Sequence, residues 1–166
     1  MAINGLQELF VQGLQAVYDA EQQGINAAPA IAARVTHPEL KQKLQERTDR
    51  GQQQLQRLEQ AIQQAGSTPK GEPNEIAKGI LAVGNKIMNE TQDPDARDAG
   101  IIASGQIALH YHMAAYGTLR AYAEALGNDE AAQLLQQTLD ERKQQDQDMT
   151  QLAEQVVNPK ATANAA

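Results

Sequence analysis

The sequence contains no cysteine and no tryptophan, and it has only one phenylalanine and four tyrosines. Without cysteine there is no disulfide framework, thiolate zinc site, iron–sulfur cluster or cysteine nucleophile. Aromatic residues are among the strongest strand formers, so their scarcity also argues against a β-sheet. These absences leave an all-helical protein as the expected class.

Positive charge is also scarce, because 14 Lys and Arg residues face 21 Asp and Glu residues and give a formal net charge of −7. No basic run is present through which the chain would bind nucleic acid or an anionic membrane surface. No stretch approaches the roughly 18 apolar residues of a membrane span. The chain does not open on a basic segment followed by a short apolar stretch, as a secretory signal would. We therefore expect no nucleic-acid or membrane partner and, by default, a cytoplasmic protein.

Helix-forming residues dominate what is present, with 28 alanines and 24 glutamines. Thr36 and Pro38 form a helix start, Asp93 begins a similar signal, and Gly127 is typical of a left-handed helix stop. Pro29 is expected to kink the first helix or end it early. The expected long helices span 4–34, 38–65, 94–126 and 129–157, with a shorter helix at 74–90.

Each long helix has one stripe of apolar residues at three- and four-residue steps. Four such stripes are buried most simply in a four-helix bundle. Two short connections predict two antiparallel hairpins, whereas residues 66–93 are long enough to travel along the bundle. The expected fold is all-α: a ferritin-like four-helix bundle with a short crossover helix between helices two and three. It forms a single domain over 1–157, followed by a flexible tail at 158–166.

Polar side chains interrupt these stripes near the middle of the bundle. Glu21 and His112 have stripe residues three or four positions away on both sides, and Glu141 lies between Leu134 and Met149 on the stripe of its helix. Their side chains are therefore expected to face the bundle centre. Isolated buried carboxylates are costly, and a divalent cation compensates them. This pattern indicates a metal site shared by several helices.

An internal ion-pair network would compensate the same carboxylates without a metal. Arg47, Arg50 and Arg142 are the candidates for it. A dinuclear carboxylate site in such a bundle takes a Glu-x-x-His motif from each of two helices, and the sequence contains no such motif. No phosphate-binding loop or Gly-x-Ser-x-Gly nucleophile motif occurs either.

Three segments resemble a known family: YDAEQQ at 18–23, HYHMAAYGTL at 110–119 and TLDERK at 138–143. In this order they are similar to the YciE/YciF family of bacterial ferritin-like stress proteins, over about residues 6–157. The resemblance implies a ferritin-like bundle with a crossover helix. It also implies a cytoplasmic protein, commonly a homodimer, that is associated with general stress responses.

The resemblance also implies roles for individual residues. Glu21 and Glu141 match acidic residues that resemble ligands of the family's metal site. Tyr18 and Tyr116 match tyrosines near that site. The family's activity is poorly defined, so the resemblance implies a fold more firmly than a function.

Two helices depart from the family's ligand pattern. Where the family tends to show His-x-x-Glu-Thr in helix two, this chain has RTDRG at 47–51, so the acidic ligand is missing or shifted to Asp49. In helix three the family's Glu-His-Tyr-Glu becomes LHYH at 109–112, which loses one carboxylate and replaces the other with the His112 imidazole. The candidate metal ligands are thus Glu21, Asp49, His112 and Glu141. The departures argue against a dinuclear iron or manganese centre, and they leave a one-metal site or a metal-free bundle with Arg50 as the counter-charge.

Three hypotheses on function follow. The incomplete ligand set favours a ferritin-like stress-response protein without efficient oxidase activity, which acts through interaction or structure. The alternative is a metalloprotein with iron or manganese and with oxidase or peroxide-detoxifying activity. In the third, a strip of small residues on the 94–126 helix serves oligomerisation only. No catalytic residue is assigned, and whether the protein is an enzyme stays open.

Overall fold

The computed structural model describes residues 3–163, and its regular structure in that range is helical throughout. The four long helices are α1 (Leu6–Ala32), α2 (Pro38–Gln64), α4 (Pro94–Ala125) and α5 (Asp129–Leu152). The shorter helix α3 (Glu75–Glu90) lies between α2 and α4 in the chain. All five predicted helices are present, and the bounds of α1 to α4 lie within two residues of the predicted ones. The helix α1 contains Pro29 and ends three residues after it.

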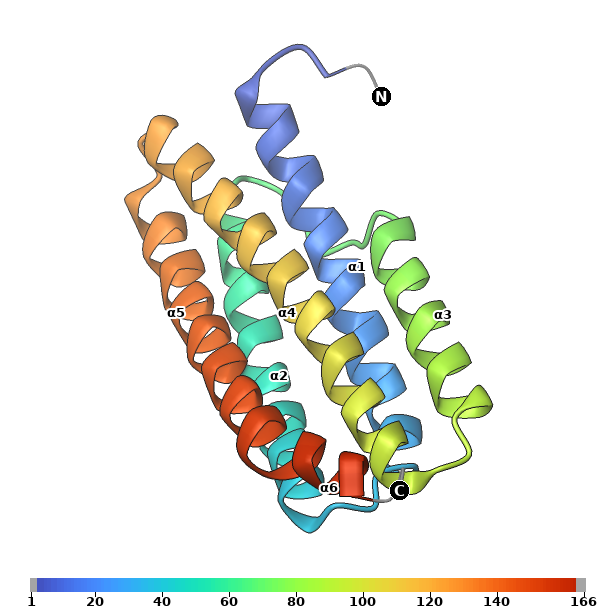
Figure 1. The fold of residues 1–166 in the computed structure, drawn as a ribbon. Coiled ribbons are helices and arrows are strands. Elements are labelled where there is room, and N and C mark those ends of the chain that lie inside the picture. Colours follow the sequence, from blue (N-terminus) through green and yellow to red (C-terminus); the bar gives the residue numbers. More distant parts are fainter. Residues whose placement is uncertain (1–2, 164–166) are drawn as a thin grey trace.

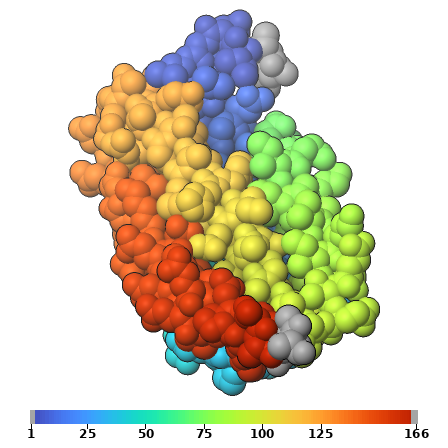
Figure 2. Space-filling view, viewed as in Figure 1, coloured from blue at the N-terminus to red at the C-terminus, as the bar shows by residue number. Residues whose placement is uncertain are grey.

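The long helices form a bundle in which each one contacts two neighbours (Figure 1). α1 lies against α2 and α4, and α5 lies against the same two helices. Across the bundle, α1 is therefore diagonal to α5, and α2 is diagonal to α4. α3 runs along the outside of the bundle, against α4 and α1. The start of α1 extends beyond the end of α3 in the space-filling view (Figure 2). This arrangement confirms the predicted all-α bundle with a crossover helix. No helix in the described range is long and apolar enough to cross a membrane.

Specific contacts hold the crossover segment in place. The Asn74 side chain caps α3 by accepting from the Ala77 amide, and its Nδ2 also donates to the Ala16 carbonyl of α1. On α4, a Cβ added at Gly100 would collide with the Ile87 side chain of α3. The glycine therefore lets α3 approach α4 closely.

The start of α2 differs from the prediction. Thr36 does not cap the helix, and His37 occupies the cap position without a side-chain cap bond. Instead, the fully buried Asp98 of α4 accepts hydrogen bonds from the Thr36 amide, the Thr36 hydroxyl and the His37 amide. A carboxylate from another helix satisfies the free amides that a local cap would otherwise satisfy.

The chain stays helical past residue 157, the predicted end of the domain. A π-helical turn, η1 (Ala153–Val157), leads into α6 (Asn158–Ala163). Pro159 lies in the first turn of α6, where its missing amide costs nothing. Lys160 Nζ lies 2.8 Å from Asp95 Oδ1 and ties this turn to α4. The helical part thus reaches residue 163, and the last residues of the predicted tail, 164–166, lie outside the described range.

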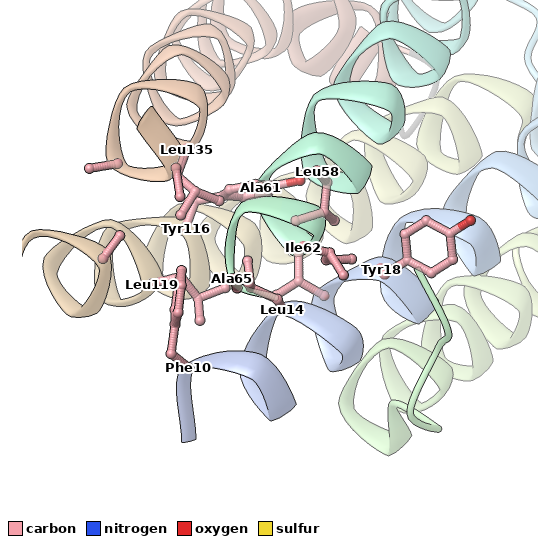
Figure 3. Packing of buried hydrophobic residues seen from close by; sticks show 14 of the residues in the cluster. Phe10, Leu14, Tyr18, Leu58, Ala61, Ile62, Ala65, Tyr116, Leu119 and Leu135 are labelled. Carbon is pink, nitrogen blue, oxygen red and sulfur yellow. The ribbon is translucent and has the colours of Figure 1, made fainter. Parts of the chain in front are cut away.

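Two apolar clusters fill the bundle interior. The first lies toward the start of α1 and includes, among others, Phe10, Leu14, Leu58, Ile62, Tyr116, Leu119 and Leu135 (Figure 3). The second lies toward the opposite end and includes Leu40, Met88, Ile102, Leu109, Met149, Leu152 and Val157. On α4 and α5 the clusters adjoin at the level of His112 and Arg142, and the polar side chains there divide the core into two halves.

Candidate functional site

A layer of polar side chains crosses the bundle between the two apolar clusters. Each long helix contributes one member: Glu21 from α1, Arg47 from α2, His112 from α4 and Arg142 from α5. Each of these residues continues the three- and four-residue spacing of its helix's apolar stripe, so the local helical periodicity alone turns it inward. We treat this polar layer as the candidate functional site.

The centre of the layer is an ion pair between Glu21 and Arg142. Arg142 Nη2 lies 2.6 Å from both carboxylate oxygens of Glu21 and donates to them. Only 4% of Glu21 and 2% of Arg142 are exposed. Because α1 and α5 are diagonal, the Arg142 side chain spans the middle of the bundle to reach its partner. Its Nη1 also donates to Gln145 Oε1 at 3.2 Å.

Tyr116 and His112 of α4 complete the surroundings of the Glu21 carboxylate. The Tyr116 hydroxyl donates to Glu21 Oε1 at 3.0 Å. His112 Nδ1 lies 3.3 Å from the same oxygen, but without the alignment of a hydrogen bond. Glu21 Oε1 of α1 therefore has polar neighbours from both α4 and α5.

The charges of the layer are fixed at neutral pH. Burial by itself would raise the pKa of Glu21, but Arg142, His112 and the hydrogen bonds lower it to about 2. Burial lowers the pKa of His112 to about 4, with Arg142 and Arg47 contributing, so its imidazole is neutral. Burial and Glu21 raise the pKa of Tyr116 well above its usual value. A carboxylate that stays ionised and a phenol that stays protonated are poorly suited to acid–base catalysis near pH 7.

Arg47 is a second cation in the layer. Burial and the neighbouring Arg142 lower its pKa to about 10, so the guanidinium remains protonated at neutral pH. The charges of Arg142 and Glu21 act on it electrostatically, but it forms no hydrogen bond or ion pair with any residue in the described range.

The structure brings together only two of the four predicted metal ligands, Glu21 and His112. Glu141 points toward α2, where Arg57 Nη2 donates to its Oε1 at 2.8 Å and Gln54 Nε2 donates to its Oε2 at 2.7 Å. Asp49 is exposed and accepts a hydrogen bond from Gln45, one turn away on the same helix.

The expected counter-charge and one expected tyrosine also lie elsewhere. Arg50 pairs with Glu46 at 3.6 Å near the surface, so Arg142 rather than Arg50 neutralises Glu21. The Tyr18 hydroxyl donates to Glu59 Oε1 at 2.9 Å and does not reach the layer, whereas Tyr116 does.

The donor set does not fit the metal centre that a ferritin-like bundle implies. In the described range no three His, Asp or Glu side chains are grouped so as to hold a metal ion. Both oxygens of Glu21 are already bound to Arg142, whose positive charge also opposes a divalent cation. The arrangement therefore resembles the ion-pair alternative that the sequence left open.

The register of α5 carries a signal that favours Arg142 over Glu141 as the inward residue. From Leu135 on, the inward stripe of this helix is Leu135, Thr138, Arg142, Gln145, Met149 and Leu152, and Leu139 beside it is buried as well. These steps alternate strictly between three and four residues, and Glu141 lies one residue off them. Glu141 fits the stripe only approximately, whereas Arg142 lies four residues after Thr138 and three residues before Gln145.

The chain matches known proteins along almost its whole length. Residues 5–162 match the family DUF892, a domain of unknown function. Protein YciF of Escherichia coli (strain K12) is 31% identical over 166 residues, which cover 99% of this chain and 100% of YciF. The crystal structure of the E. coli stress protein YciF superposes with a TM-score of 0.89 at 30% identity, covering 94% of this chain and 99% of that one. YcfI from Rhodopseudomonas palustris superposes with a TM-score of 0.87 at 32% identity, covering 89% and 94%.

Proposed function

The chain belongs to the DUF892 family, and from that premise we propose that it is a ferritin-like, cytoplasmic stress-response protein without efficient oxidase activity. The sequence match to YciF and the superposition on the E. coli stress protein YciF support the stress-related part of this proposal and confirm the resemblance to the YciE/YciF family. The proposal is that the protein acts through its structure or its interactions rather than through a metal-catalysed reaction.

One observation carries the second half of the proposal. Arg142 donates to both oxygens of Glu21 at the bundle centre, where metal ligands would converge in a ferritin-like protein. An ion pair with several added hydrogen bonds compensates the buried carboxylate, so no divalent cation is needed for that purpose. The remaining imidazole, His112, does not make a metal centre by itself.

Metal analysis tests this proposal directly. Protein purified without chelator, loaded with ferrous or manganous ion and then desalted, is expected to retain far less than one metal ion per chain. The Glu21→Gln and Glu141→Gln variants are expected to retain equally little. Elemental analysis by mass spectrometry is the measurement. Stoichiometric iron or manganese that disappears in Glu21→Gln but persists in the matched Glu141→Gln control would overturn the proposal in favour of a metalloprotein.

We also propose that the protein is a homodimer, as the resemblance to the family implies. Sedimentation velocity at micromolar concentration is expected to give a species of twice the 18.0 kDa chain mass. A single monomeric species across that range would contradict the proposal.

A further inference from the structure

The outer side of α1 and α4 is only half covered within the described residues. α3 lies along both helices and begins at the level of Tyr111, whose hydroxyl accepts a hydrogen bond from Asn74 Nδ2 at the α3 cap. Beyond that level, toward the start of α1, a hollow of about 460 Å³ lies between the two helices, and Figure 2 shows α4 at the surface between α3 and α5. The lining of the hollow includes Leu9, Gly13 and Ala16 of α1 and Ala114, Ala115 and Thr118 of α4.

This side carries very little charge, although charged residues make up 21% of the chain. No Asp, Glu, Lys or Arg occurs over residues 9–18 of α1 or 99–119 of α4. Among the residues that line the hollow, only Glu72 is charged. The exposed imidazole of His110 lies 3.2 Å from Asp146 of α5, which places it at the edge away from α3. Depletion of charge is typical of the centre of a protein–protein interface.

Exposed apolar side chains gather on the same elements. Within the described residues, the large apolar side chains that are exposed are Ile3 and Leu9 near the start of α1, Ile76 and Val83 of α3, and Ile107 of α4. Ile87 is four residues after Val83 on the same face of α3 and lies against Gly100 of α4, so this face of α3 flanks α4. Ile107 is seven residues before Ala114 and eleven before Thr118, so it shares one face of α4 with the hollow. Exposed apolar patches of this kind mark sites of protein association.

The covered half and the open half of this side complement each other. α3 has 16 residues and is about 24 Å long, and α4 continues for about 21 Å from Tyr111 to its end at Ala125. A two-fold axis perpendicular to α4 at the level of Tyr111 would therefore place the α3 of a second copy over the open half of the first, and the reverse. The same rotation brings Ile107 of each copy to the level of Ala115 in the other, where the hollow lies.

We propose that a second copy of this chain docks on this side, with Ile107 and α3 of each copy seated against the hollow of the other. The inference rests on the homodimer proposed above and names its interface. Such a contact is isologous, because one two-fold axis makes both halves at once. Two features point to a second copy as the occupant. The halves match in length, and two chains that each carry a net charge of −7 repel least where neither is charged.

Sedimentation velocity of a charged variant tests the interface. Ile107→Glu is expected to sediment as a monomer at concentrations where the wild type is a dimer, because each copy would bury a carboxylate in the hollow of the other. Ile107 is 55% exposed in the single chain, so the variant is expected to keep its fold, which circular dichroism checks. Gln137→Glu adds the same charge at an exposed position of α5 and is expected to stay dimeric. A dimeric Ile107→Glu variant would overturn the interface and leave the homodimer standing, whereas a monomeric wild type would overturn both.

The absence of cysteine from the chain permits a second test, which adds no charge. In Ile107→Cys/Ala114→Cys the two positions are about 10 Å apart along one helix, too far for a disulfide within a chain. Mild oxidation is expected to link two chains, seen as a dimer on a non-reducing gel. Gln137→Cys/Gln144→Cys has the same spacing at exposed positions of α5 and is expected to stay unlinked. A variant at 107 and 114 that sediments as a dimer but does not cross-link beyond this control would overturn the interface.

Discussion

Replacing Arg142 with alanine is expected to lower the free energy of unfolding by about 3 to 5 kcal/mol, because the change leaves Glu21 buried and ionised without its partner. Glu21 is only 4% exposed in the folded protein, so water that enters the space left by the guanidinium replaces only part of its stabilisation. Arg47 remains as a cation of the layer that interacts electrostatically with Glu21, and its approach would place the loss at the lower end of that range. Urea unfolding followed by far-ultraviolet circular dichroism measures the change.

Arg50→Ala is the matched control for this experiment. Its side chain is 43% exposed and its partner Glu46 lies 3.6 Å away, so the loss is expected to stay below about 1 kcal/mol. Equal losses for Arg142→Ala and Arg50→Ala would contradict the assignment of Arg142 to a buried pair.

A double substitution tests whether the cost comes from the orphaned charge rather than from lost contacts. In Glu21→Gln/Arg142→Met both charges are removed, while the glutamine oxygen still accepts from the Tyr116 hydroxyl. Replacing a buried ion pair by uncharged groups of similar volume is often neutral, so most of the lost stability is expected to return. A double variant as unstable as Arg142→Ala would mean that packing, and not charge, dominates.

The fold could be predicted from the sequence because its determinants are local. Apolar spacing at three and four residues defined each helix, and Asp93 and Gly127 marked a start and a stop that the structure confirms. The Asp93 and Asn128 side chains accept from Ala96 and Ala131, and Gly127 has a φ of 71°. The start of α2 was the exception, because Asp98, which binds Thr36, lies 62 residues further along the chain. A contact between positions so far apart leaves no mark on local spacing.

The candidate site could be predicted only in part. A polar layer at the middle of the bundle followed from the interrupted stripes, and Glu21 and His112 do lie in it. On α2, stripe positions recur as Leu40, Leu44, Arg47, Gly51, Gln54 and Leu58, so strict spacing selects Arg47 and leaves Asp49 and Arg50 outside. Which arginine reaches Glu21 depends on which helices are diagonal, and spacing within one helix does not contain that information.

Stability is expected to fall by up to about 3 kcal/mol between pH 6.5 and pH 4, because burial lowers the pKa of His112 to about 4. In this window the unfolded chain binds a proton at His112 that the folded protein excludes, so acid favours unfolding. Glu21 acts in the same direction at lower pH. Its folded pKa is about 2, so its contribution is complete above pH 4.5 and is lost as the pH falls toward 2.

Substitution of His112 separates the two windows. In His112→Gln the stability measured by urea unfolding is expected to be nearly flat between pH 6.5 and pH 4.5, while the loss below pH 4.5 remains because Glu21 is unchanged. His110→Gln is the control, since this imidazole on the same helix is 65% exposed and lies outside the layer, and it is expected to keep the wild-type profile. A wild-type slope in His112→Gln would show that the imidazole is not excluded from protonation by burial. The loss of stability between pH 6.5 and pH 4 would then belong to the carboxylates alone.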